Sequence, residues 1–419
     1  MFRIDALCTV KSSKRVYARD YVPNGIPFFR GREITQMSQN KPISKKLYIS
    51  KDVFEEMDKK FGSPQIGDIL LTAVGTIGNT WEVNTTPLYF KDGNIFWFSE
   101  FVTDIINPKY LKIVFESNWF QRLLRRKSSI GSVQNTLTIE KVKRLRIPLP
   151  SLDDQNRIVD QISKFSSLYN LNHTILRELE EYSKLLFHKW FIDFNFPNEK
   201  GLPYRKSGGN LHVHNGKLCP KDWTWSPLGR YISFQKGMYY ASDDIDGSSK
   251  GIPMVNLDSF TNYGGYKAEG IKNYTGTYNE TKYLHPFDLV VACTDVTRQG
   301  DIIGTPLLLP DVHGNHLLIS CDVAHIQVKK PLDTYYVQCV LQQRIYRKYI
   351  KRFANGTNVL HLNPKGIARF HTYIPDQRTL SKFSEILENI EMKRSVLIKE
   401  NQFLQNMRQI LIQKWIATR

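Results

Sequence analysis

The stretch LLFHKWFID (185–193) recurs in outline as ILIQKWIAT (410–418), close to the end of the chain. Both contain a Lys-Trp pair, at 189–190 and at 414–415, and the two pairs lie 225 residues apart. Before each pair, apolar residues recur every seven positions over about four heptads, which is the pattern of a coiled-coil seam. The sequence therefore predicts two long helices that are copies of one another and pack together.

The seam positions define the predicted core of this helix pair. They are Ile158, Phe165, Leu179 and Leu186 in the first copy and Phe383, Ile390, Leu397, Leu404 and Leu411 in the second. Asn172 also occupies a seam position, where a buried polar residue fixes the register, and Ser183 and Asn401 are candidates for the same role. Apolar residues on the outer flanks are candidates for a docking surface, namely Phe187, Phe191 and Phe403.

The start of each helix can also be identified. Ser151 followed by Asp154 is a capping pattern, and Pro375 with Asp376 is a start signal at the same 225-residue offset. Each helix spans about 33 residues and is roughly 50 Å long at 1.5 Å per residue. Because a lone seam of this length would expose an apolar strip, the two helices are expected to pair in an antiparallel arrangement.

A longer segment of mixed texture precedes each helix. GDILLTAVGTIGN (67–79) and FDLVVACTDV (287–296) predict buried strands that end in turns, and GIPFFRGREI (25–34) and GIPMVNLDSF (251–260) share Gly-Ile-Pro at an offset of 226. Asp68 and Asp288, at equivalent places, are interpreted as turn residues. The half-repeat thus includes the mixed segments, although their interiors diverge.

These features predict an α+β fold with two mixed α/β domains, joined by two long antiparallel coiled-coil helices and related by a pseudo-twofold internal repeat. A Gly-, Pro- and Asn-rich segment between the halves is interpreted as a flexible linker. The predicted boundaries are 1–150 for the first domain, 151–194 for the first helix, 195–219 for the linker, 220–375 for the second domain and 376–419 for the second helix.

The formal charge of +18 over 419 residues favours a polyanionic partner, most often nucleic acid. Residues 1–150 carry 24 Lys and Arg against 14 Asp and Glu, whereas residues 220–375 carry 17 against 13. The sequence contains no apolar run of membrane-spanning length and no secretory signal. Five cysteines without a CxxC pattern indicate free thiols in a reducing cytoplasm.

The motifs of a self-contained enzyme are missing from the sequence. It contains no Asp/Asn-Pro-Pro-aromatic loop of an amino-methyltransferase, no GxxxxGK[S/T] phosphate loop and no HExxH. His212 and His214, and likewise His313 and His316, lack a partnering cluster of metal ligands, so no metal site is predicted. The Gly75–Gly78 stretch resembles a GxxG clamp, but a turn at a strand end is the simpler interpretation.

Several stretches carry a resemblance to a known family. RIPLPSLDDQNRIVDQI (146–162) and LNPKGIARFHTYIP (362–375) resemble the junctions that close the target recognition domains of specificity (S) subunits of type I restriction-modification enzymes. GIPFFRGREI, GDILLTAVGTIGN and IDFNFPNEKGLPYRKSGGN (192–210) are similar to other stretches of that family. The resemblance covers nearly the whole chain, is best at the junctions and helices, and is weakest inside the two domains.

The resemblance implies a non-catalytic, cytoplasmic subunit that reads a bipartite target in double-stranded DNA, with one recognition domain for each half-site. Its helices would set the spacer and dock two methyltransferase (modification) subunits, to form an adenine-N6 methyltransferase. Restriction/translocase subunits would complete a nuclease. S-adenosylmethionine, ATP and Mg would be bound by the partner subunits, and no cofactor is expected in this chain.

Candidate DNA contacts are loop residues with cationic, amide or hydroxyl side chains, because such groups bind phosphates and base edges. In the first domain they are Arg30, Arg32, Lys45, Lys46, Arg125, Arg126, Lys127, Ser132, Gln134 and Asn135. In the second they are Thr297, Arg298, Gln299, Lys351, Arg352, Asn355, Thr357, Asn358 and His361. Two alternatives stay open: a coiled-coil scaffold that binds only protein, and a self-contained DNA-modifying enzyme.

Overall fold

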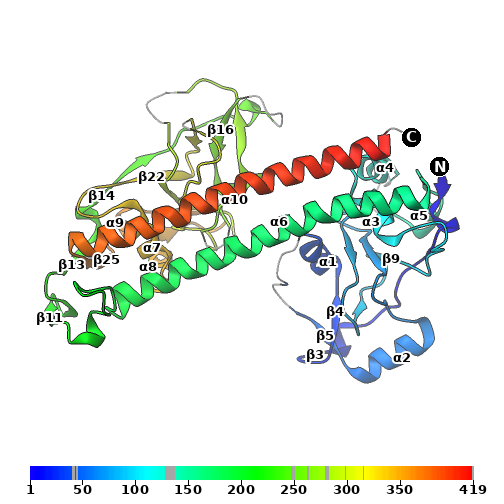
Figure 1. The fold of residues 1–419 in the computed structure, drawn as a ribbon, viewed down its shortest axis with the longest axis horizontal. Coiled ribbons are helices and arrows are strands. Elements are labelled where there is room, and N and C mark those ends of the chain that lie inside the picture. The colour runs from blue at the N-terminus through cyan, green and yellow to red at the C-terminus, as the bar shows by residue number, and fades with distance from the viewer. Residues whose placement is uncertain are drawn as a thin grey trace. The chain divides into compact units, whose positions relative to one another are not determined.

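The computed structural model describes residues 1–39, 43, 46–127, 137–246, 251–261, 264–278, 283–297, 299–314 and 316–417. It divides the chain into two compact units. Unit 1 comprises Met1–Leu171 with Asn401–Arg419, and unit 2 comprises Asn172–Glu400. Two long helices, α6 (Leu152–Phe187) and α10 (Gln377–Ala417), contribute residues to both units. The fold is mixed α/β with long helices, as the sequence predicts (Figure 1).

Unit 1 contains two four-stranded sheets. The first has the order β2 (Thr9–Lys11), β9 (Ile95–Ser99), β6 (Ile69–Thr72), β7 (Thr80–Glu82) and is antiparallel. The second has the order β3 (Tyr21–Val22), β5 (Tyr48–Ile49), β4 (Ile26–Phe29), β8 (Tyr89–Phe90), with β4 and β8 parallel. β1 (Phe2–Arg3) pairs with β10 (Arg146–Ile147). The shorter helices are α1 (Gly31–Ser38), α2 (Lys51–Phe61), α3 (Pro108–Glu116), α4 (Asn118–Lys127) and α5 (Ile139–Lys143).

Unit 2 repeats this topology. Its first sheet has the order β14 (Ile232–Lys236), β22 (Val323–Val328), β18 (Leu289–Ala292), β20 (Pro306–Leu308). Its second has the order β15 (Ile245–Asp246), β17 (Lys272–Tyr274), β16 (Ile252–Val255), β21 (Leu318–Ile319), again with the last pair parallel. β13 (Thr224–Pro227) pairs with β25 (His371–Ile374). The shorter helices are α7 (Thr334–Gln342), α8 (Arg344–Ile350) and α9 (Lys365–Arg369).

Two features of unit 2 go beyond the shared topology. A hairpin joins β11 (Leu211–His214) to β12 (Lys217–Pro220), and a three-stranded sheet has the order β19 (Thr294–Asp295), β24 (Leu360–Leu362), β23 (Ala354–Asn355). The buried strands predicted at 67–79 and 287–296 are β6 and β18, and all four residues of each are buried. Since the two units share strand order and strand direction, the internal repeat includes the mixed domains.

The two long helices run antiparallel within each unit. In unit 1, Ile158 and Ile162 of α6 share a core with Ile412 and Ile416 of α10, while Gln405 donates to Tyr169 at 2.8 Å. In unit 2, the Asn172 amide donates to the Glu400 carboxylate at 3.0 Å, and the rings of Trp190 and Phe383 lie 5.7 Å apart.

The predicted seam residues line this contact to different depths. Six of them are buried, at 158, 186, 383, 390, 397 and 404, and the other three are half-buried, at 165, 179 and 411. The polar seam residues Asn172, Ser183 and Asn401 are buried.

Both predicted helix starts are confirmed by their caps. The Ser151 hydroxyl accepts from the backbone N–H of Asp154 at 3.2 Å. The Asp376 carboxylate accepts from the N–H of Thr379 at 2.9 Å and from the Trp223 indole at 3.0 Å. These bonds outweigh the burial of the Asp376 carboxyl, which would favour its neutral form, so its pKa lies below the ordinary value.

The placement of Phe187 and Phe191 on an outer docking flank was wrong. Their side chains are 2% and 0% exposed and pack against Tyr336 and Phe383 in the core of unit 2. A π-helical turn at His188–Ile192 follows α6 and changes the direction in which the side chains point. Phe403, in contrast, is 60% exposed, as that expectation requires.

The segment after α6 is also not a flexible linker. Phe194 and Phe196 are buried in the same core as Trp223, and the Phe196 and Trp223 rings stack at 5.0 Å. The β11–β12 hairpin follows, and Cys219 at its end is buried. Aromatic residues within a Gly- and Pro-rich stretch were the signal for an ordered segment, because burying them offsets the entropy of fixing the chain.

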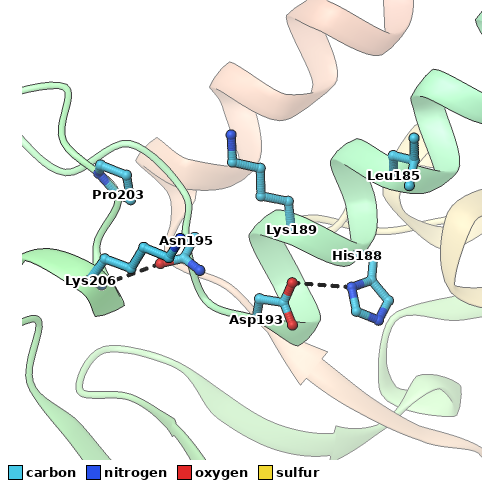
Figure 2. Close-up of a pocket in the computed structure, with 7 residues that line it drawn as sticks. All are labelled: Leu185, His188, Lys189, Asp193, Asn195, Pro203 and Lys206. Carbon is cyan, nitrogen blue, oxygen red and sulfur yellow. Dashed lines mark hydrogen bonds and ion pairs between the residues drawn. The ribbon is translucent and has the colours of Figure 1, made fainter.

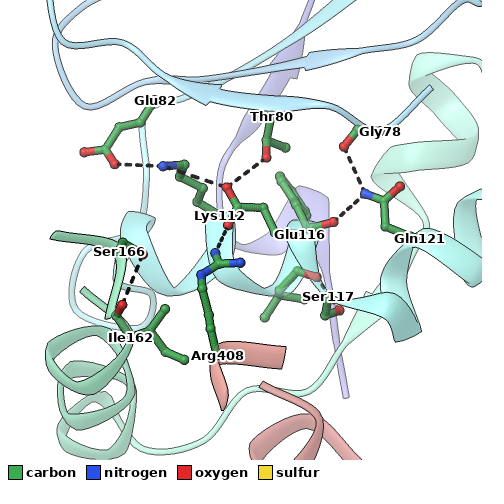
Figure 3. A network of polar contacts seen from close by, with 12 residues as sticks. Gly78, Thr80, Glu82, Lys112, Glu116, Ser117, Gln121, Ile162, Ser166 and Arg408 are labelled. Atoms are coloured by element: carbon green, nitrogen blue, oxygen red, sulfur yellow. Dashed lines mark hydrogen bonds and ion pairs between the residues drawn. The ribbon is translucent and has the colours of Figure 1, made fainter. Parts of the chain in front are cut away.

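A partly buried polar network attaches α10 to the first domain inside unit 1 (Figure 3). Arg408 of α10 forms an ion pair with Glu116 at the end of α3, and Thr80 and Lys112 also contact that carboxylate. The Arg408 and Glu116 side chains are only 22% and 25% exposed, so this pair is screened less than a surface pair.

We expect a double-mutant cycle with Arg408→Met and Glu116→Gln to give a coupling free energy of about 1 kcal/mol, measured by urea unfolding. The matched control is the exposed Arg177–Glu178 pair, whose side chains are 70% and 67% exposed. Its coupling should be close to zero, and equal couplings for the two pairs would contradict a structural role for Arg408.

In the described part of the chain, no helix is long and apolar enough to cross a membrane.

Candidate nucleic-acid interface

In unit 2 the three-stranded sheet β19-β24-β23 brings two predicted loops together. Thr294 pairs with His361, and Asp295 pairs with Leu360, so the turn that follows β19 lies beside the hairpin formed by β23 and β24. Lys351 connects the two loops by a hydrogen bond, since its ammonium donates to the backbone carbonyl of Gln299 at 2.8 Å. Loops more than 50 residues apart in the sequence thereby form one surface.

Most of the predicted residues on this surface face solvent. Those with exposed side chains are Gln299, Lys351, Arg352, Asn355, Thr357, Asn358 and His361. Thr297 is half-buried, and Arg298 lies outside the described residues. The surface therefore presents amides, hydroxyls, an imidazole and two cations, which can donate to and accept from base edges and phosphates.

Unit 1 has a related arrangement at the equivalent place. The N–H of Leu137 donates to the carbonyl of Ala73 at 3.3 Å, just as Leu362 donates to Cys293 in unit 2 at 2.8 Å. The predicted contacts Ser132, Gln134 and Asn135 lie outside the described residues. Arg125 and Arg126, near the end of α4, are exposed, whereas Lys127 ends that helix and its side chain is not described.

The other predicted cations of unit 1 differ in their partners and in their exposure to solvent. Arg30 forms an ion pair with Glu33 at 2.8 Å, and Glu33 is almost fully buried. Burial favours the neutral form of the Glu33 carboxyl, but hydrogen bonds from Arg30 outweigh it, so the pKa of Glu33 lies below its ordinary value. Arg30 thus stabilises the start of α1. Arg32 and Lys46 are exposed, and Lys45 lies outside the described residues.

A basic helix face recurs in both units and includes two residues that the sequence reasoning missed. Arg122, Arg125 and Arg126 are exposed on α4, at the i, i+3, i+4 spacing of one helix face. Lys348, Lys351 and Arg352 are exposed at the end of α8 and in the following turn, each 226 residues further on.

The opposite faces recur at the same offset. Phe120 and Leu124 of α4 are buried, as are Tyr346 and Ile350 of α8. The Gly-Ile-Pro offset of 226 was the signal that could have revealed Arg122 and Lys348.

A shallow pocket of about 430 Å³ lies in unit 2 beside the π-helical turn (Figure 2). Its polar lining includes Lys189, Lys206 and a His188–Asp193 pair at 3.2 Å. His188, Lys189 and Lys206 are exposed, and Asp193 is half-buried. Within the described ranges, no group of three His, Cys, Asp or Glu residues could hold a metal ion.

Other residues with reactive side chains have structural partners. His214 accepts from the N–H of Trp225 at 2.9 Å, and His313 bonds to Tyr266 at 2.5 Å. Asp68 accepts from the Trp97 indole at 2.7 Å, and Asp288 from the N–H of His285 at 2.8 Å, consistent with their interpretation as turn residues.

The cysteines are poorly suited to nucleophilic chemistry. All five are free thiols, and burial raises the pKa of each. The pKa of Cys8 rises to about 12 and that of Cys293 to about 11. Since the thiolate is the nucleophile, a raised pKa disfavours the reactive form of each thiol near neutral pH.

Comparisons with known proteins agree with a DNA-reading role. Residues 1–181 match the domain family described as "Type I restriction modification DNA specificity domain". A relative from Haemophilus influenzae, "Putative type I restriction enzyme specificity subunit S.HindORF215P", is 32% identical over 162 residues, which is 38% of each chain. "Type I restriction enzyme MjaIX specificity subunit" from Methanocaldococcus jannaschii is 24% identical over 84% of this chain and 77% of that protein.

A solved structure shares the fold. The "Type-I restriction-modification system S subunit from M. genitalium" superposes with a TM-score of 0.55 at 14% identity, and the match covers 99% of this chain and 95% of the other. The likeness therefore extends over both units.

Proposed function

We propose that this chain, which belongs to the type I restriction-modification DNA specificity subunits, reads a bipartite target in double-stranded DNA with one half-site for each unit. The observation that carries the proposal is the duplicated surface. Each unit has an exposed basic helix face at the same place in the same topology, and in unit 2 the hairpin of β23 and β24 follows it in the chain. Cations of this kind position a protein on phosphates, whereas loop side chains read base edges.

The divergence between the two units supports the reading of two different half-sites. Where the unit 2 surface carries Asn355, Asn358 and His361, the aligned sequence of unit 1 carries a different set of side chains. Under this proposal, residues 1–150 and 220–375 act as target recognition domains, and α6 and α10 form the coiled-coil spacer. A pseudo-twofold relation between the units would present two similar surfaces to one duplex.

The outer faces of the long helices are the proposed docking surfaces for two methyltransferase (modification) subunits. In unit 1 the exposed apolar side chains are Leu168, Leu171, Phe403 and Ile410; in unit 2 they are Tyr182, Leu185, Met392 and Val396. Isolated apolar residues are ordinary on a surface, but residues repeated along a helix face are typical of a partner helix.

The same proposal assigns the chemistry to other subunits. S-adenosylmethionine would bind to the modification subunits, and ATP and Mg to restriction/translocase subunits where the system has them. This chain would be non-catalytic and would act in the cytoplasm, where the DNA lies.

A protein-binding scaffold is the second candidate, and the exposed apolar residues on α6 and α10 favour it. It does not explain why both units place three exposed cations at the same place in the same topology. A self-contained DNA-modifying enzyme is less well supported, because the sequence has no Asp/Asn-Pro-Pro-aromatic loop of an amino-methyltransferase.

The test is methylome sequencing of a host that carries this chain with its cognate modification subunit, against a host in which only this chain is deleted. We expect a bipartite methyladenine motif that disappears with the deletion. If the modification subunit is expressed and no motif is lost, the result favours the protein-binding scaffold over the DNA-reading subunit.

A further inference from the structure

The turn that follows β6 in unit 1 is shorter than the turn that follows β18, the equivalent strand of unit 2. In unit 1, Gly78 donates to the carbonyl of Thr72 at 2.9 Å and closes a turn of five residues, 73–77. In unit 2, Gly304 donates to the carbonyl of Ala292 at 2.8 Å and closes one of eleven, 293–303. The extra residues include Thr297 and Gln299, two of the DNA contacts predicted from the sequence.

The two turns are also held by different side chains. In unit 1 the buried Thr72 hydroxyl bonds to the carbonyl of Thr76 and accepts from the N–H of Asn79 at 3.0 Å. The equivalent residue in unit 2 is Ala292, which has no polar side-chain atom. The longer turn therefore needs another anchor.

Asp295 supplies that anchor. Its carboxylate is 0% exposed and accepts from three backbone N–H groups, those of Thr297 at 2.7 Å, Ile302 at 2.6 Å and Ile303 at 2.9 Å. These donors come from both ends of the turn, so one carboxylate fixes its entry and its exit. The bonds are charge-assisted and offset the cost of burying the acid.

Two further contacts define the conformation between these ends. The Thr297 hydroxyl accepts from the N–H of Asp301 at 2.9 Å, and Lys351 holds the Gln299 carbonyl. The β19–β24 pairing sets the turn beside Asn355 and His361. A base-reading surface requires this kind of fixed geometry, because a bidentate contact depends on the orientation of both partners.

We propose that Asp295 is a positioning residue that determines which bases unit 2 accepts, by holding the turn around Gly300 against the β23–β24 hairpin. The inference rests on the proposed function. It assigns a specificity role to a buried acid that itself touches no DNA.

The decisive variant is Asp295→Asn, which keeps the size of the side chain. The amide oxygen can still accept from Ile302 and Ile303, but the amide NH2 would then face the N–H of Thr297, where two donors oppose each other. The turn should loosen at its Thr297 end. We expect the preference for the recognised base over the others to fall about tenfold at one or more positions of the half-site that unit 2 reads. A bidentate contact contributes that order of discrimination.

The matched control is Asp333→Asn in the same unit. Asp333 caps α7 through the N–H of Tyr336 at 2.9 Å and also contacts Ser384 of α10. Its replacement should lower the Tm of the chain without changing the motif, because this carboxylate lies outside the turn. Asp333→Asn should lower the Tm about as much as Asp295→Asn does and leave the recognised bases unchanged. A change of motif in Asp295→Asn alone would then reflect the position of the turn and not a general loss of stability.

The readout is the methylome motif produced by the full chain with its modification subunit. The half-site of unit 2 is first identified as the one lost when Asn355 and Asn358 are both replaced by Ala. If the wild type yields a bipartite motif that Asp295→Asn leaves unchanged, or if both half-sites degrade together, the positioning role is overturned. If the wild type yields no bipartite motif, the proposed function itself fails.

Discussion

Replacing Arg122, Arg125 and Arg126 together by Gln should flatten the salt dependence of duplex binding. Each phosphate contact contributes about 0.9 to the slope of log K against log salt, so three lost contacts reduce the slope by about 2.7. At 0.1 M salt this corresponds to roughly 500-fold weaker binding. The three side chains are exposed on one face of α4, whose opposite face packs Phe120 and Leu124 into the core, so the helix should persist.

A control with the same change of charge is available in the same unit. Lys51, Lys59 and Lys60 are exposed on α2, a helix without a buried residue that lies away from α4 (Figure 1). Their replacement by Gln should leave the slope nearly unchanged. Equal slopes for the two triple variants would mean that only the overall charge attracts DNA, and α4 would then be removed from the interface. Binding is measured by fluorescence anisotropy at several salt concentrations.

Sequence periodicity predicted the parts of the fold that local physics determines. The heptads, the Ser151 and Asp376 caps and the two buried strands all follow from short-range patterns, since burial and hydrogen bonding at these positions depend on nearby residues. The interior of each mixed domain could not be predicted in the same way. Sheet order depends on contacts between strands far apart in the chain, which one sequence does not reveal.

The errors have a physical cause as well. A helical wheel places Phe187 and Phe191 relative to a continuous α-helix, whereas a π-helical turn begins at His188 and Tyr336 of another segment covers both rings. The sequence did not reveal the ion pair of Arg30 with the buried Glu33, and the DNA contact expected of Arg30 stays a prediction. Asp295 escaped notice because its role lies in bonds to three backbone groups, for which no sequence motif exists.

Lengthening both long helices by one heptad should move the two half-sites apart by about three base pairs. Seven residues add about 10 Å to a helix, and B-DNA rises about 3.4 Å per base pair. The insertion points are after Leu171 in α6 and after Glu400 in α10, where the two units meet in the chain. A copy of the preceding heptad keeps the seam on the same face, because seven residues are close to two helical turns.

The printed contacts that hold each unit together should survive this insertion. Tyr169 and Gln405 stay on the unit 1 side, and Asn172 and Glu400 stay on the unit 2 side. Insertion into α6 alone is the control, because it shifts one seam against the other and separates these pairs; methylation should then be lost. If the double insertion leaves the half-site separation unchanged while methylation persists, the length of the helices does not determine that separation. The recognition domains must then determine it in another way.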